Sequence, residues 1–372
     1  MVTDVQKIIE NLQGMARHTR VFASMPYVEN ITPVCMEKPE VRSFFDASIH
    51  GWRRDGIFAL NEIGLSPLDH GNLYGDAVFE GIRVENRRII LLKEHIFRWF
   101  ESAQRIGLKF PYTESEIAEI LVKLCKETLE NGGTDAYIRP VLTRGIGNLG
   151  VNPAKCLAPT LYIICSSISL YPADCYKKGI DMSIARKIRR NDPSHLDPNI
   201  KSNNYLNNVL ALLETYETGA HETIMLTNDG YIAEATADNL FVAERIDDHL
   251  RLTCPAPEYA LVGTTRNLVI QAAREIGMEV IESPTLLPTD LIGPNREVFI
   301  TGTACGLMPV RSIDGLPTAS NHDILNRLRE PIQALKKRHA YGLSIDANSE
   351  EIQSYMQIPA SLKPWDNYTI SH

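Results

Sequence analysis

A proline-marked break at residues 170–174 divides the chain into two halves, and strand and helix patterns alternate in both. Before the break, the spacing of apolar residues predicts strands at 78–84, 89–92, 137–144 and 160–167 and helices at 94–106 and 114–130. After it, the spacing predicts strands at 180–186, 222–227, 231–235, 239–244 and 297–301 and helices at 204–218, 265–277 and 321–339. We therefore expect a mixed α/β (α+β) chain of two domains.

The expected domain bounds follow this patterning. They are an N-terminal helical extension at 1–48, a small α/β domain at 49–169, a linker at 170–174, a large cofactor-binding domain at 175–318, and a C-terminal helix and tail at 319–372. The extension should carry an amphipathic helix at 4–16. We expect Pro331 to kink or end its helix, and the last thirty or so residues to dock loosely.

Composition excludes several classes of function for these 372 residues. A net charge of −8 without a basic tract argues against nucleic-acid binding. No histidine spacing is typical of a metal site, and no apolar stretch is long enough to span a membrane. The N-terminus lacks an apolar signal core, and the seven cysteines include no C-x-x-C pair. We expect a cytoplasmic enzyme with free thiols, without a metal, a nucleic-acid partner or a membrane partner.

The segment Pro198–Asn208 places a single lysine, Lys201, between turn-forming residues and the start of a helical pattern. A lysine that is desolvated at such a junction has a lowered pKa, and its amine is then available for Schiff-base chemistry. Most lysines in front of a helix are simply exposed to solvent. A catalytic role for Lys201 therefore needs support from other stretches of the chain.

Four further stretches provide that support. Thr264 and Thr265 follow Gly263 at the start of a helix, where free N–H groups and the helix dipole suit a phosphate. A strand ends at Thr301–Ala304 in small hydroxyl residues. Glu234 follows a strand among small residues, and Arg98 lies near the start of a helix. Taken alone, the two threonine stretches are more often an ordinary helix cap and a strand turn, and the charged residues can equally be surface charges.

Six motifs taken together resemble the class IV (fold-type IV) pyridoxal-phosphate-dependent aminotransferases, and within them the branched-chain amino acid aminotransferases. The motifs are Tyr74–Arg83, Ala136–Pro140, Ile200–Asn208, Gly230–Glu234, Gly263–Arg266 and Thr301–Ala304. The resemblance extends from about residue 56 to about residue 316. It implies a fold-type IV enzyme of two domains with pyridoxal 5'-phosphate between them.

The resemblance also implies roles at the cofactor. Lys201 matches the catalytic lysine that forms the Schiff base and then moves the proton, and Glu234 matches the partner of the pyridine nitrogen. Tyr205 matches the residue that binds the phenolic oxygen, and Leu261 the side chain that packs on the ring. The residues that match the phosphate site are Arg98, Thr264 (through its backbone), Thr265 and Thr303.

On the substrate side, the matching residues are Tyr74, Tyr137, Arg139 and the backbone N–H groups of Thr303 and Ala304. The resemblance implies a homodimer with the site at the subunit interface, because Tyr74 matches a residue that reaches the neighbouring subunit. Tyr137 and Arg139 are two apart on a strand and should share one face, where Phe79 and Val151 would add apolar surface.

The chain departs from the family pattern at several positions near the site. Thr264 stands where isoleucine is usual, and Asp238 stands where glutamate or serine is common. Cys305-Gly306 replaces the usual Ala-Glu after the Thr-Gly-Thr-Ala motif. The departures near the substrate side bear on which substrate is used.

The predicted function is transamination between an L-amino acid and a 2-oxo acid, with branched-chain or other apolar amino acids and L-glutamate as donors. A lyase of the aminodeoxychorismate-lyase type and a D-amino acid or amine transaminase share the fold and stay open, although Tyr137–Pro140 favours the transaminases. A protein that keeps the cofactor as a scaffold and has lost turnover is a third alternative. The complete set of cofactor residues argues against that scaffold.

Overall fold

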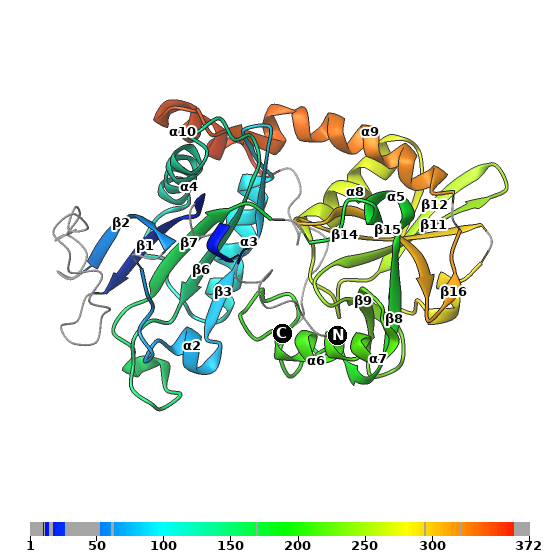
Figure 1. Ribbon diagram of the computed structural model, residues 1–372, viewed down its shortest axis with the longest axis horizontal. Coiled ribbons are helices and arrows are strands. Elements are labelled where there is room, and N and C mark those ends of the chain that lie inside the picture. The colour runs from blue at the N-terminus through cyan, green and yellow to red at the C-terminus, as the bar shows by residue number, and fades with distance from the viewer. Residues whose placement is uncertain are drawn as a thin grey trace. The chain divides into compact units, whose positions relative to one another are not determined.

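The computed structural model describes residues 10, 12–14, 18–26, 53–60, 63–168, 170–293, 295–319 and 321–360. The chain forms two compact units, and each is described by itself (Figure 1). Unit 1 comprises Met1–Ile168 with Gly342–Pro359, and unit 2 comprises Ser169–Tyr341 with Ala360–His372. Most of the helix expected at 4–16 lies outside the described residues.

Unit 1 is built on an antiparallel sheet with the strand order β17-β5-β4-β6-β7-β1-β2, and β3 also pairs with β6. The strands are β1 (Arg20–Pro26), β2 (Arg53–Ala59), β3 (Ala77–Phe79), β4 (Ile82–Glu85), β5 (Arg88–Ile90), β6 (Ala136–Thr143), β7 (Thr160–Ser166) and β17 (Gly342–Ser344). The predicted hairpin between β4 and β5 turns at Asn86 and Arg87, both of which have positive φ. Positive φ at both positions suits the twist of a two-residue hairpin.

The helices of unit 1 are α2 (His70–Tyr74), α3 (Leu92–Arg105), α4 (Glu114–Thr128) and α10 (Ser349–Gln357). Helix α10 lies beside α4, and its Tyr355 is fully buried (Figure 1). The expected loose docking is therefore wrong for the described part of the tail. Two apolar side chains of α10, Ile352 and Tyr355, hold it in place, and β17 adds backbone pairing to β5.

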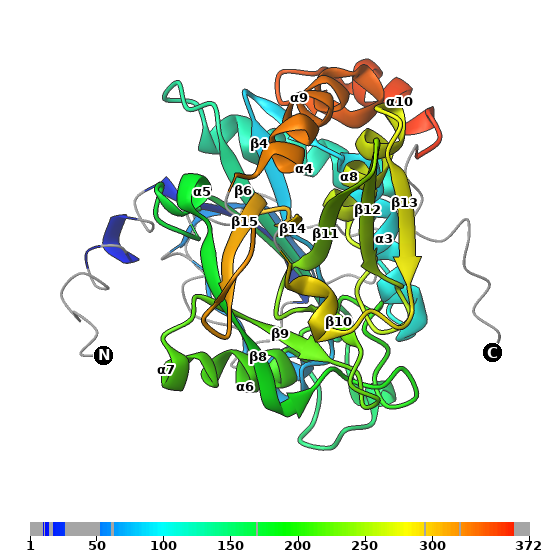
Figure 2. The ribbon, with the colours of Figure 1, turned by 90° about the vertical axis from the view of Figure 1, so that its right-hand side faces the viewer.

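Unit 2 contains a mixed sheet with the order β10-β9-β8-β15-β14-β11-β12-β13, and β16 pairs with β15. Its strands are β8 (Ile180–Arg189), β9 (Glu222–Leu226), β10 (Ile232–Ala235), β11 (Asn239–Ile246), β12 (His249–Pro255), β13 (Glu279–Ser283), β14 (Arg296–Gly302), β15 (Gly306–Ile313) and β16 (Leu316–Pro317). Figure 2 shows β11, β12 and β13 side by side, in agreement with their pairing. The pairs β8–β9, β8–β15 and β12–β13 are parallel.

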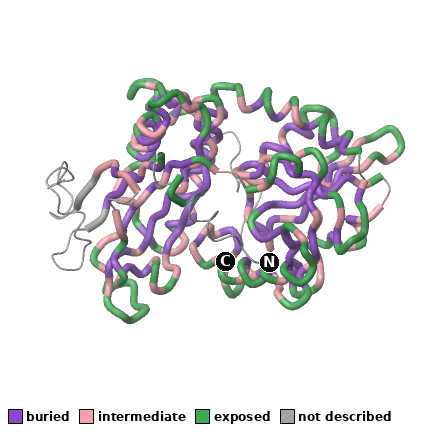
Figure 3. The backbone as a smooth tube through the Cα atoms, in the orientation of Figure 1, coloured by how far each residue is buried: buried purple, intermediate pink, exposed green. Residues whose placement is uncertain are grey.

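One apolar cluster spans this sheet from β10, its first strand, to β11. It brings Ile232 of β10 and Leu240 of β11 together with Ile224, Met308 and Val298 from the strands between them. Figure 3 shows that the strands of unit 2 are largely buried. The sheet therefore curves around its own core. Such a curved sheet places the ends of β10, β11 and β14 around a common region.

Helices cover the outside of this sheet. They are α5 (Cys175–Lys178), α6 (Leu206–Leu213), α7 (Thr215–Thr218), α8 (Thr264–Glu275) and α9 (Asp323–Lys337). Helices α8 and α9 pack against each other and on β14, while α6 packs on β8 and β9. The helix predicted at 204–218 is divided between α6 and α7 at Glu214, whose carboxylate accepts hydrogen bonds from the backbone N–H groups of Arg186 and Ile188.

Helix α9 continues through Pro331 to Lys337, so the proline does not end it. A proline removes one helical hydrogen bond, and burial on both sides of it compensates for that loss. The buried face runs from Ile324 and Leu325 before the proline to Ile332 and Leu335 after it.

Candidate active site

Lys201 lies on a loop of unit 2 that other segments hold in place. Its Nζ is 3.4 Å from the hydroxyl oxygen of Tyr205, the residue that precedes α6. Two residues earlier, Asn199 donates to the carbonyl of Pro257 at 2.8 Å and accepts from the N–H of Val262 at 3.0 Å. The side chain of Asn199 thus ties the lysine loop to the segment that leads into α8.

Glu234 on β10 is a buried carboxylate that several donors fix. Its Oε1 accepts from Arg190 Nε at 2.8 Å, and its Oε2 accepts from the N–H of Leu261 at 3.1 Å and from Asn239 at 3.3 Å. Burial raises the pKa of Glu234 above its usual value, while the charges of Arg190 and Lys201 act in the opposite direction. A carboxylate offers about four acceptor positions, so these three bonds leave room for a further donor.

Asn239 connects three parts of the site. Its side chain donates to the carbonyl of Leu261 at 2.8 Å as well as to Glu234. A Cβ at Gly263 would lie 2.1 Å from Asn239 Oδ1, so glycine is required where α8 begins. Asn239 pairs with Thr301 across β11 and β14, which brings the end of β14 next to the same group. The buried hydroxyl of Thr301 has no hydrogen-bond partner among the described residues.

The start of α8 is suited to an anion. Thr264 and Thr265 are its first two residues and are buried, and the N-cap residue, Gly263, has no side chain with which to cap the helix. The N–H groups of the first turn and the helix dipole therefore favour a phosphate. Thr303 and Ala304 lie in the turn between β14 and β15 and are half-buried. These groups of unit 2 could hold pyridoxal 5'-phosphate, with the amine of Lys201 and the carboxylate of Glu234 at the ring and the start of α8 at the phosphate.

The other predicted site residues belong to unit 1. Arg98 is buried on α3 and bonds to both carboxylate oxygens of Glu80, at 2.7 Å from Nε and 2.8 Å from Nη2. His95 Nδ1 lies 2.7 Å from the same carboxylate. Although burial acts to raise it, the charges of Arg98 and His95 hold the pKa of Glu80 far below its usual range. The guanidinium of Arg98 is therefore held in one orientation.

Tyr137 and Arg139 share one face of β6, as predicted. Arg139 Nη2 is 3.2 Å from the Tyr137 hydroxyl oxygen, and the guanidinium carbon is 4.7 Å from the centroid of the Phe79 ring. The buried Nε of Arg139 has no partner among the described residues. Tyr74 donates its hydroxyl to the carbonyl of Leu149. Val151 lies on an exposed loop.

The structure thus gathers one group of predicted residues in unit 2, namely Lys201, Tyr205, Glu234, Leu261, Thr264 and Thr265. Sequence reasoning missed Arg190, Asn199 and Asn239, which hold this group together. Asn199 lies next to the lysine motif and could have been suspected from that position. Nothing in the spacing of the chain indicates Arg190 as the partner of Glu234.

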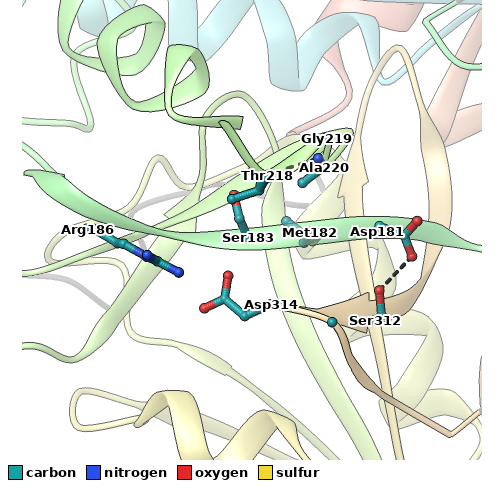
Figure 4. Close-up of a pocket in the computed structure, with 10 residues that line it drawn as sticks. Asp181, Met182, Ser183, Arg186, Thr218, Gly219, Ala220, Ser312 and Asp314 are labelled. Atoms are coloured by element: carbon teal, nitrogen blue, oxygen red, sulfur yellow. Dashed lines mark hydrogen bonds between the residues drawn. The ribbon is translucent and has the colours of Figure 1, made fainter. Parts of the chain in front are cut away.

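A separate cavity of about 420 Å³ opens on unit 2 (Figure 4). Asp181, Arg186, Thr218 and Asp314 are among its lining residues, and none of the predicted site residues line it. Asp181 already accepts from Ser312 at 2.6 Å, as Figure 4 shows, and pairs with Arg311. The described part of the chain contains no cluster of histidine, cysteine or acidic residues that could hold a metal ion. Within that same part, no helix is both long and apolar enough to cross a membrane.

The family model for amino-transferase class IV matches residues 77–313 of this chain. A putative branched-chain-amino-acid aminotransferase from Methanocaldococcus jannaschii is 39% identical over 277 residues, which cover 74% of this chain and 92% of the relative. The chain therefore belongs to the class IV aminotransferases, which are pyridoxal-phosphate enzymes, and its reaction is transamination.

Two solved structures show the same fold. The crystal structure of the Escherichia coli branched-chain amino acid aminotransferase is similar with a TM-score of 0.71 and 28% identity, over 78% of this chain and 97% of that one. A T.th. branched-chain amino acid aminotransferase, complexed with N-(5'-phosphopyridoxyl)-L-glutamate, has a TM-score of 0.69 and 28% identity, over 78% and 96% of the two chains. The expected fold-type IV α/β class is thereby confirmed.

Proposed function

We propose that this chain transfers the amino group of an aliphatic L-amino acid, above all a branched-chain one, to a 2-oxo acid, with L-glutamate and 2-oxoglutarate as the other pair. Lys201 is the lysine that holds pyridoxal 5'-phosphate through a Schiff base. The observation that carries this assignment is that Lys201 lies beside Tyr205 and close enough to the buried Glu234 for its charge to act on the pKa of that carboxyl. The substrate assignment draws on the names of the relatives and on the phosphopyridoxyl-glutamate bound to one of them.

When bound, the cofactor supplies an electron sink for the pair of electrons left at the substrate Cα. Glu234 would accept the ring N–H at its remaining acceptor position and keep that nitrogen protonated. Arg190 and the N–H of Leu261 hold the carboxylate so that this position is fixed. The N–H of Leu261 also places this residue next to Glu234, which suits its predicted role against the ring face.

Lys201 Nζ would hold the cofactor and then take the proton from the substrate Cα, acting as the general base. The Tyr205 hydroxyl, 3.4 Å from that amine, would bind the phenolic oxygen. The N–H groups of Thr264 and Thr265 at the start of α8, together with Thr303, would bind the phosphate. Arg98 would also bind the phosphate, and the ion pair with Glu80 would hold its guanidinium in one orientation.

On the substrate side, Arg139, Tyr137 and Tyr74 would bind carboxylate oxygens, together with the N–H groups of Thr303 and Ala304. The contact of Arg139 with the Phe79 ring supports a wall that is polar at one end and aromatic at the other. Such a wall suits both the second carboxylate of glutamate and an aliphatic side chain.

We also propose that the enzyme is a cytoplasmic homodimer with its site at the subunit interface, and that Tyr74 reaches the partner's site. Helices α6 and α7 expose Leu206, Leu210, Leu213 and Tyr216, at 69%, 42%, 44% and 71%. An apolar patch of this kind on a helix is typical of a subunit interface. The six described cysteines are all free, which suits a reducing compartment.

A rapid-mixing screen of L- and D-amino acids against the loaded enzyme tests the substrate assignment. We expect L-valine, L-leucine, L-isoleucine and L-glutamate to change the cofactor absorbance, and 2-oxoglutarate to restore it. Conversion by D-amino acids alone would contradict the assignment. Release of pyruvate from aminodeoxychorismate would instead assign the chain to the lyases.

A further inference from the structure

Asp238 is a buried carboxylate for which the proposed reaction gives no role. It lies in the tight turn between β10 and β11, where its carbonyl accepts the N–H of Ala235 at 2.9 Å. From α6, Asn208 donates to the carbonyl of Thr236 in the same turn at 2.6 Å. This turn therefore has a backbone fixed from two sides.

The side chain of Asp238 contacts both ends of another turn, the hairpin from Gly302 to Gly306 that joins β14 to β15. Cys305 Sγ donates to Asp238 Oδ1 at 3.3 Å. A Cβ built on Gly302 would lie 1.8 Å from the same oxygen, so the carboxylate packs directly on the backbone at that position. Asp238 and Cys305 are two of the positions at which this chain departs from the family pattern, and here they contact each other.

The chemistry of the two groups preserves this hydrogen bond. Burial, reinforced by the neighbouring Asp238, raises the pKa of the Cys305 thiol well above its usual value, so the thiol keeps its proton and remains a donor. Burial also raises the pKa of Asp238, while the thiol and the positive charge of Lys201 act to lower it. The carboxylate thus lies within the electrostatic reach of Lys201 and in direct contact with the turn.

We propose that Asp238 is a positioning residue that, through Cys305 and Gly302, fixes the turn carrying Thr303 and Ala304, and so sets the N–H groups that receive the substrate carboxylate. The proposal rests on the proposed function for the role of those N–H groups. The contact itself, and the rigidity that it gives to the turn, do not depend on that role.

The test compares Asp238→Ala, Cys305→Ala and the double variant as holoenzymes, with Cys175→Ala as the control. Cys175 is also a buried thiol of unit 2, and it lies in the apolar core. We expect each site variant to raise the KM for the amino donor on the order of tenfold, because a buried hydrogen bond to a charged group is lost. The kcat and the bound cofactor should change little. The double variant should raise the KM no more than the more damaging single variant does, because both substitutions remove the same hydrogen bond.

Amide hydrogen exchange provides a readout that does not depend on activity. We expect faster exchange at residues 303–306 in both single variants, and exchange like that of the wild type in Cys175→Ala. Cys305→Ser keeps a donor and should restore most of the protection. Unchanged exchange at the turn, additive effects on KM, or a loss of thermal stability without a change in KM would each overturn the proposal. A wild-type enzyme that did not convert aliphatic amino acids would contradict the proposed function alone, and the exchange comparison would still decide the role of Asp238.

Discussion

At the scale of single residues, the chemistry of the site depends on carboxylates whose partners are remote in sequence. Lys201, Glu234 and the threonines of α8 could be singled out from the sequence because each lies in a short motif. Arg190 could not, because it meets Glu234 only when β8 and β10 take their places on either side of β9. Asn239 was missed for the same reason, since its contacts with Leu261 and Gly263 join separate segments of the fold.

Glu222 leads to a prediction about pH and stability. It is buried beside Thr236 Oγ1, at 2.7 Å, and burial raises its pKa to about 7. Between pH 4.5, the ordinary pKa of this carboxyl, and about pH 7, Glu222 is protonated in the folded state and ionised in the unfolded state. The stability that Glu222 contributes is therefore fully present below this window and is lost as the pH rises through it, by about 3 kcal/mol at most.

We expect the free energy of unfolding to fall from pH 5 to pH 8, and Glu222→Gln to flatten this dependence. Urea unfolding at fixed ionic strength measures the free energy of unfolding of the wild type and the variant at each pH. If the free energy of unfolding depended on pH equally in the variant and the wild type, Glu222 would have the same pKa in the folded and unfolded states, and the prediction would be wrong.

At the scale of elements, the sequence predicted most helices and many of the strands to within a few residues. It missed β12, β13 and β15. The alternation of polar and apolar residues in β12 could have been recognised, whereas β13 is short and β15 contains Pro309, so neither has a clear pattern of its own. Helix α9 does not end at Pro331, and the described part of the tail is docked through α10, because tertiary packing overrides local preference at both places.

Helix α9 is capped by a strand rather than by its own N-cap residue. Glu297 on β14 is buried and accepts the N–H groups of Ile324 at 2.9 Å and Leu325 at 2.9 Å. Glu297→Ala should lower the free energy of unfolding by about 2 kcal/mol, because two buried donors lose their acceptor. Glu330→Ala, on an exposed position of the same helix, should change it by less than about 0.5 kcal/mol. Denaturant unfolding compares the two variants, and equal losses would contradict the capping role.

At the scale of the whole molecule, the chain makes two compact units, and its described C-terminal segment returns to unit 1 through β17 and α10. That return could not be predicted from the sequence, because β17 is only three residues long and has little pattern of its own. The exposure of Leu206, Leu210, Leu213 and Tyr216 on α6 and α7 became visible only in the fold.

This surface leads to a prediction about assembly. Replacing both Leu206 and Leu210 with glutamate should weaken the proposed homodimer on the order of a hundredfold or more, because two apolar side chains at an interface are lost. Leu316→Glu, at another exposed leucine of unit 2, is the control and should leave the assembly unchanged. Analytical ultracentrifugation over a range of concentrations measures the association. A double variant that associates as the wild type does would place the dimer interface elsewhere.

The central claim is that Lys201 holds the cofactor. Borohydride reduction of the loaded enzyme, followed by peptide mapping, identifies the lysine that carries it. We predict the reduced adduct on the peptide that contains Lys201, its loss together with turnover in Lys201→Ala, and its retention in Lys187→Ala, where an exposed lysine is removed from β8. An adduct on any other lysine of the wild-type chain would contradict the account.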